Sequence, residues 1–227
     1  MYRIPKFFLL KLIGAFLILL VTFYSTQAQS DFKQKKHRFF NIIGGYRLMP
    51  GSSKLNNRLA SDYFPKLFSP HYIFGIDYGS ASKRGIVKMQ FSNTGAFVGK
   101  SSHYSLLRTA SISFKYGSDI LPKVARTYLY PFVGYNLLIY NFVSNNSTDS
   151  TEGQKLSATK IDFDLVTGVG IKQFFKKEFI GLFSNIDINA GISIPTITGK
   201  WRQKGSNYLV GMYRLQSVFD FTASIGF

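Results

Sequence analysis

The last eleven residues of the chain, 217–227, alternate between apolar side chains and polar or small ones. The apolar phase consists of Phe219, Phe221, Ala223, Ile225 and Phe227. Because side chains point alternately to the two faces of a strand, one face of this strand is almost wholly apolar. Such a strand at the uncovered edge of a soluble domain invites aggregation. The pattern therefore favours a closed barrel in a membrane, where the last strand pairs with the first and its apolar face meets lipid.

The start of the chain has the order of a secretory signal peptide. Arg3, Lys6 and Lys11 supply positive charge, an apolar run follows, and Ala28 precedes a plausible cleavage point. The alternative is a permanent anchor, but the apolar run is short for the ~20 residues of a spanning helix. We expect a cleaved signal peptide at 1–28, a short flexible lead at 29–37 and a single barrel domain at 38–227.

The composition is strongly basic, with 28 Lys and Arg against 11 Asp and Glu. Such a surplus suits nucleic acid, membrane phosphates or acidic partners. Loss of the three cations of the signal peptide leaves 25 against 11, a net charge of +14. Because an exported protein does not normally meet nucleic acid, nucleic acid is excluded as its normal partner. There is no cysteine, so disulfides and thiol chemistry are excluded.

Alternation recurs along the exported part and predicts eight strands, at about 38–48, 71–80, 87–92, 104–116, 126–143, 160–172, 180–192 and 210–227. The connections alternate in length: long, short, medium, short, long, short and long, at 50–70, 81–84, 94–102, 117–124, 144–157, 175–178 and 195–208. Bacterial outer-membrane barrels have short turns on the periplasmic side and longer loops outside. The sequence therefore predicts an all-β fold, an eight-stranded antiparallel up-and-down transmembrane β-barrel.

The alternative fold is a soluble sandwich or a lipocalin-like ligand-binding barrel, which would put the apolar phase inside. Three features favour the membrane barrel instead. They are the signal peptide, the terminal Phe227, and lone charges such as Lys88 and Asp187 in the phase that is otherwise small or polar. In a membrane barrel these charges face the interior and the apolar phase faces lipid.

Several short patterns resemble one known class of protein. They are the run Tyr130-Pro-Phe-Val-Gly-Tyr-Asn136, the segment Gly168-Val-Gly170, a Lys-rich short turn and the ending Ile-Gly-Phe. Together they resemble the small outer-membrane β-barrels of diderm bacteria, the porin-family or OmpA/OmpX-like barrels, over residues 38–227. The resemblance implies insertion by the outer-membrane assembly machinery, with Phe227 as part of the assembly signal. The class includes adhesins, lipopolysaccharide-contacting stabilisers, narrow pores and a few lipid-modifying enzymes.

Ten charged residues fall in the inward phase of the predicted strands. An eight-stranded barrel is just wide enough for its own side chains, and buried charges must pair or hydrogen-bond. We expect a salt-bridged plug. Asp162 and Asp164 share a face and suggest paired catalytic carboxylates. The preferred interpretation is that each forms an ion pair with a nearby Lys or Arg. The ten are Arg47, Asp77, Lys88, Lys115, Lys160, Asp162, Asp164, Lys172, Asp187 and Asp220.

Cations also gather in the predicted outer loops, where they suit the phosphates of lipopolysaccharide. The alternative is a solvated basic loop set, because the predicted periplasmic side is basic as well. The candidate lipopolysaccharide contacts are Lys54, Arg58, Lys100, Lys200, Arg202 and Lys204. The periplasmic cations are Lys33, Lys35, Lys36, Arg38, Lys83, Arg84, Lys123, Arg126, Lys176 and Lys177.

Signals for catalysis are weak. His103 and Ser105 share a strand face near the outer rim, as in barrel-shaped lipid A deacylases, but Asp119 lies at the opposite end of the same strand, too far to orient the His. The segment Gly95 to Ser101 is one residue short of a phosphate loop. No cluster at metal-ligand spacing appears, and we expect neither a catalytic site nor a cofactor nor a metal.

We expect a non-enzymatic, monomeric outer-membrane barrel that acts as a structural or interaction protein through its outer loops, by adhesion or by contact with lipopolysaccharide. The expected partners are outer-membrane lipids, lipopolysaccharide and the assembly machinery, with no nucleic acid. Two alternatives stay open: a narrow porin-like transport path and, with less support, a lipid A-modifying hydrolase.

Overall fold

The computed structural model describes residues 31–49, 56–57, 59–60, 65–67, 71–100, 103–124, 126–146, 154–175, 182–203 and 217–227. The signal peptide predicted at 1–28 lies outside these ranges. The elements with described bounds are the short helix α2 (Asp31–Gln34) and nine strands. The strands are β1 (His37–Leu48), β2 (His71–Ser82), β3 (Gly85–Lys100), β4 (His103–Gly117), β5 (Thr127–Asn146), β6 (Gln154–Phe174), β7 (Asn185–Thr198), β8 (Arg202–Gln203) and β9 (Val218–Gly226).

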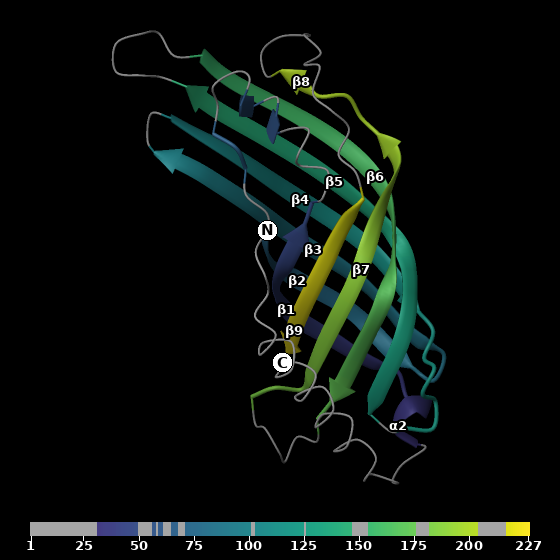
Figure 1. Cartoon of the computed structure of the whole chain (residues 1–227). Helices are drawn as coiled ribbons and strands as arrows, with labels where there is room; N and C mark the ends of the chain where they lie inside the picture. The colour runs from purple at the N-terminus through teal and green to yellow at the C-terminus, as the bar shows by residue number, and fades with distance from the viewer. Residues whose placement is uncertain are drawn as a thin grey trace, which may run out of the picture.

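Eight of the strands close into an antiparallel barrel (Figure 1). Strands β1 to β7 pair in sequence order except across the closure, where β9 pairs with both β7 and β1. The remaining strand, β8, is a two-residue addition to the outer part of β6. The predicted eight-stranded up-and-down barrel is confirmed.

The C-terminal strand closes the barrel as its alternation predicts. In the register of β1 with β9, Ile42 lies opposite Ile225 and Tyr46 opposite Phe221. Its other neighbour is β7, where Ile188 lies opposite Ala223. The predicted beginning of this strand near residue 210 lies outside the described residues.

Apolar side chains cover the outside of the barrel. Along β2 the burial alternates residue by residue, and Tyr72 and Phe74 are 69% and 68% exposed. The same holds on β5, where Tyr135 is 67% exposed and Asn136 on the other face is buried. Exposed apolar area costs about 25 cal/mol per Å² in water, so an exterior of this kind requires lipid. The predicted facing is confirmed, and the soluble alternative is wrong.

Strands β3 to β6 are longer than the sequence predicts. The expected loop 94–102 is mostly strand, because β3 continues to Lys100, and β5 and β6 pair as far as Asn146 and Gln154. Strand β7 also passes Pro195, with a register shift opposite Phe163. In these outer parts polar and small residues interrupt both phases, so no continuous apolar phase predicts a strand. Figure 1 shows the long strands rising beyond the others at the end opposite α2.

The inward-facing core has an apolar layer at each end of the barrel. At the outer end, Met49, Leu59 and Leu67 from the β1–β2 connection pack against the inner faces of the long strands. At the other end, aromatic side chains surround Phe174. Between the two layers the interior is charged and polar. In the described residues there is no helix of the length and hydropathy needed to cross a membrane.

Candidate functional site

The charged interior of the barrel is electrically balanced. All ten residues that the alternation assigns to the interior face inward, and nine of them are buried; Asp220 is partly buried. Five are cations and five are carboxylates, so at neutral pH their formal charges sum to zero. Balance removes the fixed net charge that selects ions in charged pores.

In the half of the lumen nearest α2, the carboxylate of Asp187 lies close to two lysines. The Lys88 amine donates to Asp187 Oδ2 at 3.0 Å and to Asn189 Oδ1 at 2.8 Å. Lys172 Nζ lies 3.7 Å from the same Oδ2. Tyr130 donates its hydroxyl to Asp187 Oδ1 at 2.7 Å, so both carboxylate oxygens are engaged. The ion pairs and hydrogen bonds offset part of the free-energy cost of removing these charges from water.

In the outer half of the lumen lie two ion pairs, one between β1 and β9 and one within β6. Arg47 donates from Nε and Nη2 to the two oxygens of Asp220, each at 2.8 Å. Lys160 donates to Asp162 Oδ2 at 2.6 Å, and the Gly199 amide donates to Oδ1 at 3.0 Å. Asp162 therefore forms the ion pair with a nearby cation that the sequence predicts.

Asp164 differs from its neighbour. Its side chain is buried, and its Oδ1 accepts no hydrogen bond from any described residue. The cation that the sequence argument expects for it is not in hydrogen-bond contact at this oxygen. The two aspartates thus share a face without forming a symmetric carboxylate pair.

The short helix α2 inserts a lysine into the periplasmic end of the barrel. Lys33 donates to Asp119 Oδ2 at 2.6 Å and to the Leu121 carbonyl at 2.5 Å, and its amine lies 4.4 Å from the centre of the Tyr128 ring. Burial lowers the pKa of Lys33, while the hydrogen bond and charge of Asp119 oppose that shift. Phe32 stacks on the His37 ring at 3.8 Å. These contacts join Phe32 and Lys33 to the barrel end formed by β1 and the β4–β5 connection.

The deacylase alternative finds no support in the geometry. Ser105 faces inward, is fully buried, and its hydroxyl lies 2.8 Å from the Ser144 hydroxyl. His103 is exposed at the start of β4, and Asp119 lies beyond the other end of that strand, bound to Lys33. Within the described ranges, no three His, Asp or Glu side chains gather as a metal site would require.

The six candidate lipopolysaccharide contacts are only partly visible. Arg202 is exposed in β8, Lys200 is exposed just before it, and Lys100 ends β3. The other three lie outside the described residues: Lys54, Arg58 and Lys204.

One exposed cation was missed by the sequence argument. Arg108 occupies the outward phase of β4, between Leu106 and Ala110, and is exposed. The strand pairing joins Arg108, Asn141, Thr159 and Arg202 in one continuous row across β4, β5, β6 and β8. We call these four exposed residues the outer polar row. The sequence signal for it is the cation that interrupts the apolar phase of β4.

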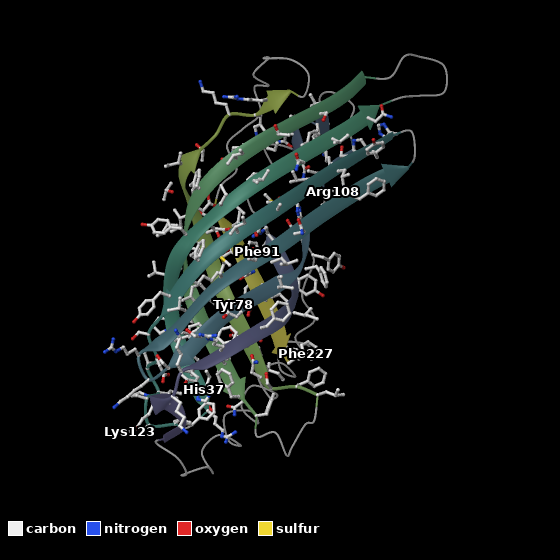
Figure 2. All side chains as sticks on the ribbon, turned by 180° about the vertical axis from the view of Figure 1, so that it is seen from behind. His37, Tyr78, Phe91, Arg108, Lys123 and Phe227 are labelled. Carbon is white, nitrogen blue, oxygen red and sulfur yellow. The ribbon has the colours of Figure 1, made fainter. Side chains whose placement is uncertain are left out.

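On β4 the outer polar row interrupts the apolar outward phase, which resumes beyond it with Leu106 and Tyr104. All outward residues of β4 between Arg108 and the periplasmic turn are apolar or aromatic: Ala110, Ile112, Phe114 and Tyr116. Figure 2 shows Arg108 near the upper end of the wall, with Phe91 and Tyr78 below it and His37 and Lys123 at the lower end. A lipid-facing band bounded by polar residues is typical of transmembrane barrels. The chain has the architecture of the small outer-membrane β-barrels.

Comparison with known proteins gives structural likeness without sequence relatives. No family model matches the chain, and no curated protein matches it. The Neisserial surface protein A, NspA, aligns with a TM-score of 0.46 and 8% identity, over 85% of this chain and 98% of its own. Ail, the attachment invasion locus protein of Yersinia pestis, solved with the heparin analogue sucrose octasulfate, aligns with a TM-score of 0.43 and 13% identity, over 85% and 97%. The architecture of this outer-membrane barrel rests on its own strand pairing and apolar exterior.

Proposed function

We propose that this protein is a non-enzymatic anchor in the bacterial outer membrane, exported by a cleaved signal peptide, whose outer face carries an interaction role. The observation that carries the proposal is the balanced and capped lumen, in which seven of the ten inward charges lie in ion pairs between described residues. Five cations and five carboxylates occupy its middle, Lys33 occupies the periplasmic mouth, and the apolar cluster around Met49 occupies the outer one. A barrel filled in this way supports anchoring better than transport.

Recordings in planar lipid bilayers test the anchor against the pore. Refolded protein should insert without stepwise currents, while a wide porin refolded in the same way serves as the positive control. Because the lumen charges are held by short contacts such as Lys160 to Asp162, the absence of current should persist in 1 M salt. Reproducible unit conductances would contradict the proposal and favour the narrow transport path.

The partner that suits the outer face best is lipopolysaccharide. Arg108 and Arg202 lie three strand spacings apart in the outer polar row, about 14 Å at ~4.8 Å per strand, and Lys200 is exposed beside Arg202. Arginine binds phosphate in a bidentate manner. Cations directly above a lipid-facing band therefore lie where outer-leaflet phosphates would meet the barrel.

Binding of purified lipopolysaccharide to the refolded protein tests this contact. The double variant Arg108→Gln/Arg202→Gln should bind about tenfold or more weakly, since each charge-assisted contact is worth about 1 kcal/mol. The matched control is Lys83→Gln/Arg84→Gln, which removes two exposed cations from a turn at the opposite end. Equal binding by the two double variants would rule out the outer polar row as the lipopolysaccharide contact.

A further inference from the structure

A second charged region lies on the outside of the barrel at its periplasmic end. Lys36 and Arg38 are exposed immediately before and within the first residues of β1. No described residue supplies a carboxylate to either of them. Lys36 and Arg38 belong neither to the charged lumen nor to the outer polar row.

The two cations border a groove in the apolar wall. The groove has a volume of about 370 Å³ and crosses β1 to β4. Its lining includes Tyr78, Val87, Met89 and Phe114, with Lys36 and Arg38 at one end. The volume lies near the lower end of the ~300–1,000 Å³ of small-molecule sites. The groove is thus cationic at one end and lined by apolar side chains along the rest.

A small residue in the outward phase of β2 creates the groove. Ser80 follows Tyr72, Phe74, Ile76 and Tyr78 in that phase, and it is the first outward position without a large apolar side chain. In the register, Ser80 lies between Arg38 of β1 and Val87 of β3. A serine between these neighbours leaves a depression on the outer surface beside Arg38.

We propose that this groove binds one anionic phospholipid of the periplasmic leaflet, with the phosphate at Lys36 and Arg38 and an acyl chain along Tyr78, Met89 and Phe114. Arginine and lysine beside an apolar surface at a membrane boundary suit an anionic headgroup, and arginine adds bidentate contact with phosphate. The apolar length of the groove lies in the lipid-facing band, where only a hydrocarbon chain fills it without exposing backbone or burying charge.

Native mass spectrometry of the refolded full-length mature chain in neutral detergent tests the site. The probes are phosphatidylglycerol and phosphatidylcholine with the same palmitoyl and oleoyl chains. Wild-type protein should retain phosphatidylglycerol at least fivefold more than phosphatidylcholine. Arg38→Gln should reduce phosphatidylglycerol binding about fivefold, the factor that corresponds to ~1 kcal/mol for one cation at a membrane surface.

Two further variants separate the charge from the groove. Lys123→Gln removes one exposed cation from the β4–β5 turn, outside the groove, and should leave binding within twofold of wild type. Ser80→Trp fills the groove without changing charge and should weaken binding as much as Arg38→Gln. Correct folding of each variant is checked by its heat-modifiable band on a gel.

Three results would overturn the proposal. One is equal retention of the two lipids by wild-type protein. Another is equal loss of phosphatidylglycerol in Arg38→Gln and Lys123→Gln, which would mean a diffuse basic rim. The third is displacement of phosphatidylglycerol by glycerol 3-phosphate at matched concentration, which would mean an anion site that makes no use of the apolar groove.

Discussion

At the scale of single residues, the lumen shows how a barrel holds charge away from water. The two oxygens of Asp187 serve Lys88 and Tyr130 at hydrogen-bond distance, with Lys172 close by. Such an arrangement is strongly destabilised when one partner is removed, because the other is left charged and buried. Replacement of both partners by apolar residues of similar size is often neutral.

The pair of Arg47 and Asp220 allows a clean test of this argument. Arg47→Met and Asp220→Leu alone should each lower the free energy of unfolding, Asp220→Leu by about 3 kcal/mol because it strands a fully buried guanidinium. The double variant should recover most of that loss. The measurement is urea unfolding in lipid vesicles followed by the fluorescence of Trp201, the single tryptophan. Additive losses in the double variant would mean that the two residues do not act as a pair.

The sequence predicts which residues enter the lumen but not which of them meet. Inward facing follows from position parity along each strand, which is why all ten charges are placed correctly. Arg47 and Asp220 are 173 residues apart in the chain. Their contact depends on the register across the closure of the barrel, and a register is set by cross-strand packing that alternation within one strand does not encode. The sequence places Lys33 on the periplasmic side but does not predict its insertion into the barrel, because a lone cation in a short helix has no period.

At the scale of elements, the least expected feature is the short helix α2. Four residues form too short a helix to be stable alone, so its position depends on tertiary contacts. Lys33 reaches Asp119 on the β4–β5 connection, and Phe32 packs on His37 and Phe174. The segment that directly follows the predicted signal peptide therefore closes the periplasmic mouth.

Lys33→Ala should lower the free energy of unfolding by about 2–3 kcal/mol, because it leaves the buried Asp119 carboxylate without its cation. The change is measured as a shift in urea midpoint at constant slope. Lys35→Ala serves as the control, since Lys35 is exposed and should change stability by less than ~0.5 kcal/mol. If Asp119→Ala added to Lys33→Ala produced a further large loss, the ion pair would not be what holds α2.

The long strands mark where prediction by alternation ends. Outside the lipid-facing band, a strand no longer needs an apolar face, so the residues around Val98 and Asn145 carry no strand signal although they pair in the sheet. Prediction of the membrane-embedded parts succeeds because lipid imposes one apolar face. Prediction of the parts beyond it fails because water accepts either face.

At the scale of the whole molecule, the barrel combines an apolar exterior with a balanced interior. Exposed cations lie toward both ends of the exterior, Arg108 and Arg202 in the outer polar row and Arg38 and Lys123 at the opposite end. The longer strands and connections at the end that carries Lys200 and Arg202 favour an orientation with that end outside the cell and Lys123 in the periplasm. The absence of cysteine makes that orientation directly measurable.

Labelling of single-cysteine variants in intact cells tests the central claim, that the chain spans the outer membrane with this orientation. Lys200→Cys and Lys123→Cys both place the thiol at an exposed position. A membrane-impermeant maleimide should label Lys200→Cys in intact cells and should label Lys123→Cys only after the outer membrane is opened. Labelling of both variants in intact cells, or of Lys123→Cys alone, would contradict the account.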